Sequence, residues 1–284
     1  MRLSGPITET TADSVSWIAS VRKAGYAAAG LPFGPDTDEA TVTDYLDAAR
    51  KAGVLIAEVG AWSNPIDPDP AKAGAAIALC QRQLAWADRI GARCCVNIAG
   101  SRNPAKWDGP DPENFSKETF DLIVHTTREI VDAVNPKRTF YALETMPWIF
   151  PSSPDEYLAL INAIDRPGIA VHLDPVNMIN SPMRCYHNGD FIRECFSKLG
   201  HMIKSCHAKD IILREHLTVH LDECRPGAGV LDYVAYLGEL AKLDEDIPLV
   251  MEHMAEEDYP LAADHIRGIA RENQFNLKYH VAPC

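Results

Sequence analysis

The chain has 284 residues, 46% of them hydrophobic and 24% charged, which is the composition of an ordinary globular protein and not of a disordered chain. Its formal net charge is -13, from 27 Lys and Arg against 40 Asp and Glu. This acidic balance argues against nucleic acid or an anionic membrane surface as the main partner.

Short apolar runs rich in Val, Ile and Ala alternate along the chain with longer segments of helical spacing. Strands are predicted at residues 2–5, 26–30, 54–59, 93–98, 139–144, 169–174, 202–207 and 249–252. Helices are predicted at residues 11–23, 38–52, 69–90, 114–134, 153–164, 190–198, 231–243 and 259–273. Asp38 and Ser153 are candidate capping residues, and Glu156 stands three positions after Ser153.

This order predicts an α/β protein with a parallel sheet covered by helices. Eight strand and helix pairs without a Gly/Ser-rich linker favour a (β/α)8 TIM barrel that forms a single domain over residues 1–284. An open doubly wound sheet is the main rival, but no GxGxxG motif follows the first strand to support a dinucleotide-binding version.

No apolar run approaches the about 18 to 20 residues of a membrane span, and "MRLSGPITETTADS" lacks the apolar centre of a signal peptide. We therefore expect a cytoplasmic location. The eight cysteines include no CxxC pair, so we expect reduced thiols that are mostly buried.

Four consecutive predicted strands end in residues that bind metals. The stretches "YALETMPW", "IAVHLDPVNMI", "HMIKSCHAKD" and "PLVMEHM" supply Glu144, Asp174, His207 and Glu252. Neighbouring strands lie about 4.8 Å apart, so these side chains can close around one ion at the carboxyl ends of barrel strands, where active sites lie. A divalent cation offsets the repulsion of three buried carboxylates, and this oxygen-rich set suits Mn²⁺, Mg²⁺ or Co²⁺.

Each of these residues alone is more often a loop residue or a helix cap, but their joint occurrence on successive strands favours a shared site. Cys206 should point to the other face of its strand and is assigned to packing.

In these motifs, together with "GAWSNPIDPDP" and "RPGAG", the chain resembles the xylose isomerase-like TIM barrel family of sugar phosphate isomerases and epimerases over nearly its whole length. The resemblance implies that Glu144, Asp174, His207 and Glu252 hold one divalent metal, commonly Mn²⁺, and that Glu144 and Glu252 form the acid/base pair. It also implies a homo-oligomer, a dimer or a tetramer. Ketose 3-epimerases often carry a histidine where this chain has Asn177, so a substrate other than a free ketohexose is expected.

The chemistry agrees with this implication, because a metal that binds a carbonyl and an adjacent hydroxyl acidifies the C–H bond between them and stabilises the enediolate. A carboxylate can then move the proton. The leading hypothesis is an isomerase or epimerase for a sugar or keto-sugar. The same site could act as a dehydratase or lyase on a 3-keto sugar or glycoside, including deglycosidation.

Two other classes remain. The resemblance also extends to apurinic endonucleases, which use the same barrel, but such enzymes need more metals and a basic surface for DNA, which the net charge of -13 disfavours. The second remaining class is a barrel that binds a sugar without catalytic activity.

Several other residues are candidates for binding substrate or for supporting the site. For each of them an ordinary structural role is the alternative. His172 should share the inward face of Asp174, Arg225 could reach the substrate from the seventh loop, and Lys209 and Asp210 follow His207 directly. The remaining substrate-binding candidates, besides Asn177, are Trp62, Asn64 and Trp148.

His253 should face away from Glu252 and lie outside the site. The loop of residues 211–225, in which His216 and His220 stand at helical spacing, is expected to be a lid or an interface insertion that contacts a partner subunit.

Overall fold

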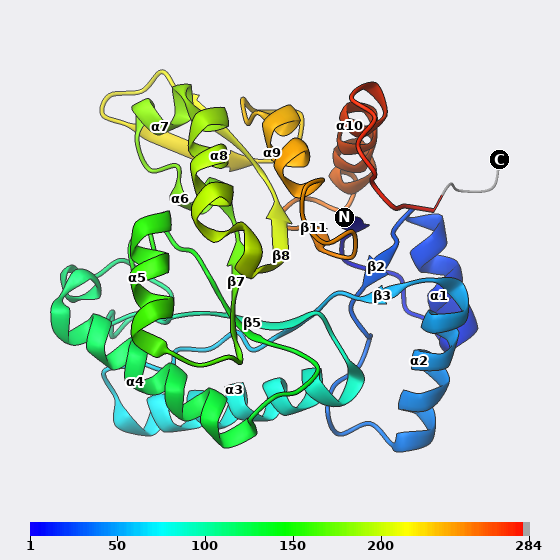
Figure 1. Ribbon diagram of the computed structural model, residues 1–284, viewed down its shortest axis with the longest axis horizontal. Coiled ribbons are helices and arrows are strands. Elements are labelled where there is room, and N and C mark those ends of the chain that lie inside the picture. The colour runs from blue at the N-terminus through cyan, green and yellow to red at the C-terminus, as the bar shows by residue number, and fades with distance from the viewer. Residues whose placement is uncertain (281–284) are drawn as a thin grey trace. The chain divides into compact units, whose positions relative to one another are not determined.

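The computed structural model describes residues 1–280, which form two compact units. The first unit comprises residues 1–57 and 174–201 and the chain from residue 205 onward, and the second comprises residues 58–173 and 202–204. Each unit consists of parallel strands and helices in alternation, so the predicted α/β class is confirmed (Figure 1). A single domain over residues 1–284 stays a prediction.

The first unit contains a parallel ladder in which β11 (Pro248–Met251) lies between β1 (Arg2–Ser4) and residues 205–208 of β8 (Ile203–Ala208). The short strands β2 (Ala28–Ala29) and β3 (Leu55–Ile56) form a second parallel pair. Val250 is opposite His207 and Met251 is opposite Ala208, so β8 and β11 end at the same level. That register brings the residues just after both strands close together.

The second unit contains four parallel strands in the hydrogen-bonded order β4 (Glu58–Gly60), β5 (Cys94–Ile98), β6 (Tyr141–Glu144) and β7 (Ile169–Leu173). All residues of β5, β6 and β7 are buried. Such continuous burial explains why these segments are apolar runs without polar alternation. All eight predicted strands are confirmed, and the segment of residues 54–59 is divided between β3 and β4.

The helices of the first unit are α1 (Ser14–Lys23), α2 (Glu39–Ala52), α6 (Pro175–Met178), α7 (Pro182–Tyr186), α8 (Asn188–Leu199), α9 (Tyr233–Leu240) and α10 (Asp258–Glu272). Those of the second unit are α3 (Pro70–Ile90), the 3-10 turn η1 (Pro112–Phe115), α4 (Lys117–Val134) and α5 (Pro154–Ile164). A further 3-10 turn, η2 (Gly200–Met202), leads into β8. In Figure 1, α3 and α4 run side by side, and α4 in turn contacts α5.

Capping residues set where the helices begin. The Asp38 side chain accepts the backbone N–H of Thr41 at 3.0 Å, as predicted. Ser153 accepts the N–H of Glu156 at 3.3 Å, but the Glu156 carboxylate turns to the N–H of Ser152 instead of that of Ser153. The predicted start of the first helix at residue 11 is wrong, because Asp13 is the N-cap and α1 begins at Ser14.

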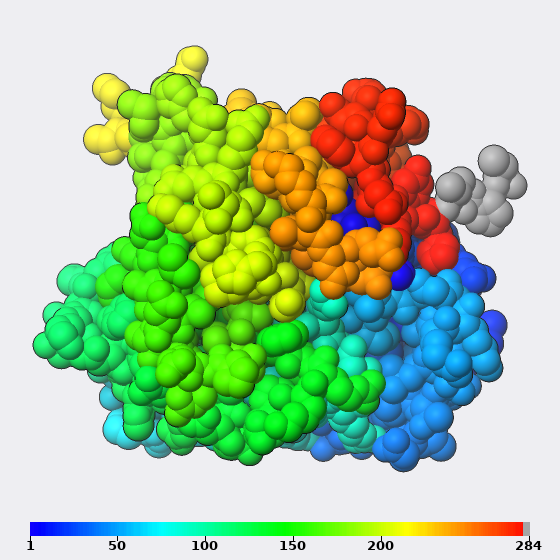
Figure 2. All heavy atoms as spheres, viewed as in Figure 1, coloured from blue at the N-terminus to red at the C-terminus, as the bar shows by residue number. Residues whose placement is uncertain are grey.

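The stretch after β8 is a hairpin of β9 (Asp210–Arg214) and β10 (His220–Cys224). His216 lies in the turn and His220 opens β10, so their helical spacing does not reflect a helix. Leu217 at the tip is fully exposed, and in Figure 2 the tip (yellow) projects from the atoms around it. An insertion after β8 is thus confirmed, while its role as a lid or interface stays a prediction.

Seven cysteines are free thiols, and all of them except the half-buried Cys224 are buried, as expected. Cys284 lies outside the described residues. Among residues 1–280, no helix combines the length and the apolar character that crossing a bilayer requires.

Replacing Asp38 with alanine should lower the free energy of unfolding by about 1 kcal/mol, because the first turn of α2 loses the acceptor for its N–H groups. Urea denaturation measures this loss. Asp38→Asn serves as the control, since asparagine caps helices as well as aspartate does. Equal stability of Asp38→Ala and the wild type would show that the cap does not stabilise α2.

Candidate metal centre

Three of the four predicted ligands lie together in the first unit. His207 belongs to β8, Glu252 follows directly after β11, and Asp174 precedes α6. The His207 Nδ1 atom is 2.9 Å from Glu252 Oε1 and 3.7 Å from Asp174 Oδ2. One ligand atom from each residue lies within 4.8 Å of the others, and the three side chains are 1%, 18% and 0% exposed. The structure therefore brings these residues into one buried cluster.

The two carboxylate oxygens of Asp174 have different tasks. Oδ1 accepts the backbone N–H groups of Val176 at 2.9 Å and Asn177 at 3.2 Å, which caps the short helix α6. Oδ2 points to His207 and Lys209. The cap fixes the orientation of the carboxylate, so a helix cap and a ligand are compatible roles for this residue.

Two buried tyrosines of α9 hold the backbone of the cluster. The Tyr236 hydroxyl donates to the carbonyl of His207 and the Tyr233 hydroxyl donates to that of Lys209, each at 2.8 Å. Burial raises the pKa of both phenols well above its ordinary value, so they remain protonated donors. The end of β8 is thereby fixed where His207 needs a defined position.

Lys209 is a member of the cluster, although sequence reasoning left its role open. Its Nζ atom is 2.7 Å from Glu252 Oε1, 2.9 Å from Asp174 Oδ2 and 3.3 Å from Glu223 Oε2. The side chain is only 1% exposed, and lysine is almost never buried unless it is paired. The signal in the sequence was its position two residues after His207, which places both side chains on one face of the chain.

The cluster keeps its carboxylates ionised. Burial raises the pKa of Asp174, but the charge of Lys209 and the hydrogen bond from His207 outweigh burial and hold the pKa below its ordinary value. Burial also raises the pKa of Glu252, yet the charge and hydrogen bond of His207, together with Lys209, lower it to about 2. Two ionised carboxylates and an imidazole form an oxygen-rich set that fits a divalent cation.

His253 lies beside this cluster, so the expectation that it faces away from Glu252 is wrong. Its Nδ1 atom is 3.3 Å from Glu223 Oε1 and 3.7 Å from Glu252 Oε1. The strand ends at Met251 and His253 has a φ of 55°, so the alternation of strand side chains no longer applies. The hydrogen bond to Glu223 is the main cause of the raised pKa of this imidazole.

Asp210 organises the turn before α9. Its buried carboxylate accepts the backbone N–H groups of Ile211, Gly227, Gly229 and Leu231 at 2.8 to 3.1 Å. A side chain at position 229 would meet this carboxylate, because a Cβ atom there would lie 2.4 Å from Asp210 Oδ1. Asp210 thus ties the "RPGAG" motif to the segment that carries His207 and Lys209.

Arg225 in the same turn is paired with an acidic residue at the start of α10. Its Nε atom is 3.2 Å from Asp258 Oδ1, and its side chain also donates to the carbonyl of Pro226 at 3.2 Å. The predicted contact of Arg225 with substrate stays a prediction.

In the second unit, Glu144 ends β6 and lies opposite His172 of β7 in register. Both side chains are buried, 5% and 0% exposed, and residues opposite one another in a sheet point to the same face. The His172 Nε2 atom is 3.6 Å from Glu58 Oε2 of β4. Glu144 thus stands at a strand end, as predicted, and its role as a ligand stays a prediction.

The predicted substrate contacts of the second unit are loop residues with different surroundings. The buried amide of Asn64 donates to the carbonyl of Ser101 at 2.7 Å and accepts its N–H at 2.9 Å. The Trp148 indole donates to the carbonyl of Asp108 at 2.7 Å, whereas Trp62 is 43% exposed. Asn64 and Trp148 therefore stabilise loops, and substrate contacts of these residues stay predictions.

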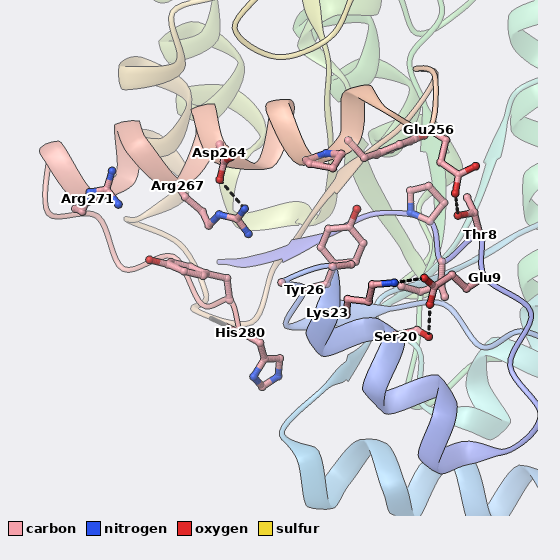
Figure 3. A pocket seen from close by; sticks show the side chains of 17 residues that line it. Thr8, Glu9, Ser20, Lys23, Tyr26, Glu256, Asp264, Arg267, Arg271 and His280 are labelled. Carbon is pink, nitrogen blue, oxygen red and sulfur yellow. Dashed lines mark hydrogen bonds and ion pairs between the residues drawn. The ribbon is translucent and has the colours of Figure 1, made fainter. Parts of the chain in front are cut away.

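A pocket of about 700 Å³ lies elsewhere in the first unit, between α1, α10 and the segment after β1 (Figure 3). Its charged and polar side chains pair with one another, as Thr8 does with Glu256 at 2.5 Å and Arg267 with Asp264 at 2.8 Å. None of the predicted site residues is among the described residues that line it. The pocket is therefore a different site from the predicted metal centre and its predicted substrate contacts.

Comparisons with known proteins agree on one fold. A family model described as xylose isomerase-like TIM barrel matches residues 18–272, so the predicted TIM barrel is confirmed. No curated protein matches the chain.

Among solved structures, the chain is 15% identical to the probable 3-DHS dehydratase AsbF, involved in petrobactin synthesis, from Bacillus anthracis, with a TM-score of 0.70 over 94% of this chain and 98% of that one. It is 17% identical to D-psicose 3-epimerase with D-tagatose from Clostridium cellulolyticum H10, with a TM-score of 0.65 over 97% and 99% of the two chains. It is 15% identical to a xylose isomerase-like TIM barrel protein from Mycobacterium smegmatis in complex with magnesium, with a TM-score of 0.63 over 92% and 89%. At these identities the solved structures establish the fold.

Replacing Asp210 with alanine should destabilise the protein by about 3 kcal/mol or more, because several backbone N–H groups lose a charged, buried acceptor. Chemical denaturation measures the loss. Asp222→Ala is the matched control, since it removes a carboxylate that pairs with Arg214 on the exposed face of the hairpin and is worth at most about 1 kcal/mol. If the two variants were equally stable, Asp210 would not organise the turn.

Proposed function

The chain belongs to the xylose isomerase-like TIM barrel family, and from this premise we propose that it is a divalent-metal-dependent enzyme that isomerises or epimerises a sugar or keto-sugar. The reaction class is the removal of a proton next to a carbonyl and its return to a different carbon or face. Sugar epimerases among the similar structures support this class of substrate.

The observation that carries the proposal is the buried cluster of Asp174, His207 and Glu252, with two ionised carboxylates beside an imidazole. We propose that Glu144, at the end of β6, completes the ligand set. Mn²⁺ is the proposed ion, and Mg²⁺ and Co²⁺ would also suit these oxygen-rich donors. The magnesium complex of the Mycobacterium smegmatis protein supports a divalent cation.

A divalent ion at this place supplies a Lewis acid that polarises the carbonyl of the substrate. The protein supplies the proton transfer. Despite burial, the charge and hydrogen bond of His207 hold the pKa of Glu252 below its ordinary value, and we propose that this ionised carboxylate accepts the proton from carbon. Glu144 is the proposed second carboxyl group, which returns a proton. His172, Asn177, Arg225, Trp62, Asn64 and Trp148 remain the proposed substrate contacts.

A second candidate is a dehydratase or lyase that eliminates water or an aglycone from a 3-keto sugar or glycoside. Two observations favour this elimination chemistry. One similar structure is a probable dehydratase. Lys209 also places an ammonium group 2.7 Å from Glu252, and such a group can donate a proton to a leaving group.

Incubation of the enzyme with keto-sugars and 3-keto glycosides in deuterated water should identify the reaction. Deuterium at carbon without a change of formula indicates isomerisation or epimerisation, and loss of water or an aglycone indicates elimination. Glu252→Gln should slow either reaction by about 10² to 10⁴-fold, because the amide cannot accept the proton. Glu239→Gln is the control on the surface pair with Lys242, and an unimpaired Glu252→Gln variant would refute the role of Glu252.

The purified protein should retain a divalent metal, detectable by elemental analysis, and chelation should abolish turnover until the metal is added back. Asp174→Asn and His207→Ala should each lose most of the bound metal, because each removes a ligand atom from the cluster. Glu144→Gln tests the fourth ligand in the same way. Full metal content in Glu144→Gln would limit the centre to the three residues of the first unit.

A further inference from the structure

Lys209 is unusual because a flexible lysine side chain is enclosed within a set of metal ligands. Its ammonium lies 2.9 Å from Asp174 Oδ2 and 2.7 Å from Glu252 Oε1, the same oxygen atoms that face His207. A lysine stem carries much rotamer entropy, and its burial is unfavourable unless its charge is compensated. The position of this ammonium therefore needs a physical reason.

The reason is repulsion between carboxylates. Asp174 is fully buried, Glu252 is largely buried, and both face the same His207 nitrogen, and two carboxylates so close together repel strongly in a medium of low dielectric constant. The ammonium between them turns that repulsion into two attractive contacts. A divalent cation bound to the same oxygen atoms would also offset this repulsion. The Lys209 ammonium and the metal ion would therefore interact with the same two carboxylates.

Lys209 also contacts a third acidic residue, which is not one of the predicted metal ligands. Glu223 of β10 is 3.3 Å from Nζ, and its side chain is 32% exposed at the edge of the cluster. An ammonium that gives up part of its contact with Asp174 and Glu252 therefore keeps an acidic partner on the hairpin. The Tyr233 hydroxyl holds the backbone carbonyl of Lys209, so the backbone at this position is fixed.

We propose that Lys209 is a positioning residue of the metal centre: its ammonium draws Asp174 and Glu252 together and sets how tightly the cluster binds a divalent cation. The inference rests on the metal centre of the proposed function. Because the ammonium and the metal compete for the same negative charge, Lys209 weakens metal binding and makes the stability of the fold less dependent on the metal.

The test compares the wild type with Lys209→Gln after treatment with a chelator and its removal. Titration calorimetry with Mn²⁺ should give a Kd at least about tenfold lower for Lys209→Gln, because the metal no longer competes with a fixed positive charge. The melting temperature in the presence of chelator should fall, and the rise on saturation with Mn²⁺ should be larger than in the wild type. Lys242→Gln, which removes a 66% exposed lysine, is the control and should change neither quantity.

An unchanged or higher Kd in Lys209→Gln, with metal binding by the wild type intact, would overturn the inference and leave the metal centre in place. If Lys209→Gln unfolds in chelator, Mn²⁺ should restore a cooperative melting transition, and failure to do so would also overturn it. Absence of Mn²⁺ binding in the wild type would overturn the metal centre and, with it, this inference.

Discussion

The structure around the predicted metal centre depends on two carboxylates that lie close together in the first unit, the fully buried Asp174 and the largely buried Glu252. Asp174 and Glu252 cannot both stay ionised in the interior unless positive charge lies between them. The ammonium of Lys209, directly after β8, supplies positive charge beside both carboxylates, and β8 is the neighbour of β11 in the sheet. The arrangement creates a place that attracts a cation and presents oxygen-rich donors to it, which is the physical basis for assigning a metal there.

The surrounding structure serves to hold this unfavourable arrangement in place. Tyrosine hydroxyls from α9 fix the carbonyls of His207 and Lys209, and the backbone at the start of α6 fixes one oxygen of Asp174. Asp210, one residue beyond Lys209, binds the turn that leads back into α9. The predicted ligands are thus held in position by hydrogen bonds from groups outside the cluster, as surrounding residues commonly do in protein metal sites.

Sequence reasoning succeeded where a residue's position follows from local periodicity. Apolar runs between helical segments indicated all eight strands, because strands buried on both faces, such as β5, β6 and β7, consist largely of apolar residues. It also placed Asp174, His207 and Glu252 correctly at strand ends. It was wrong for His253, because alternation was extended beyond Met251, where the strand stops and the backbone adopts a positive φ.

The sequence by itself determined the α/β class, the order of strands and helices and the residues available for a metal, since these depend on hydrophobic periodicity and on residue type. Only the tertiary structure decided which charges compensate one another. Lys209 and Glu223 belong to different segments, and Glu223 and Glu252 are 29 residues apart in the sequence, yet Lys209 contacts both. Electrostatic pairing depends on distance in space, which strand register and the hairpin after β8 establish and which local sequence patterns do not encode.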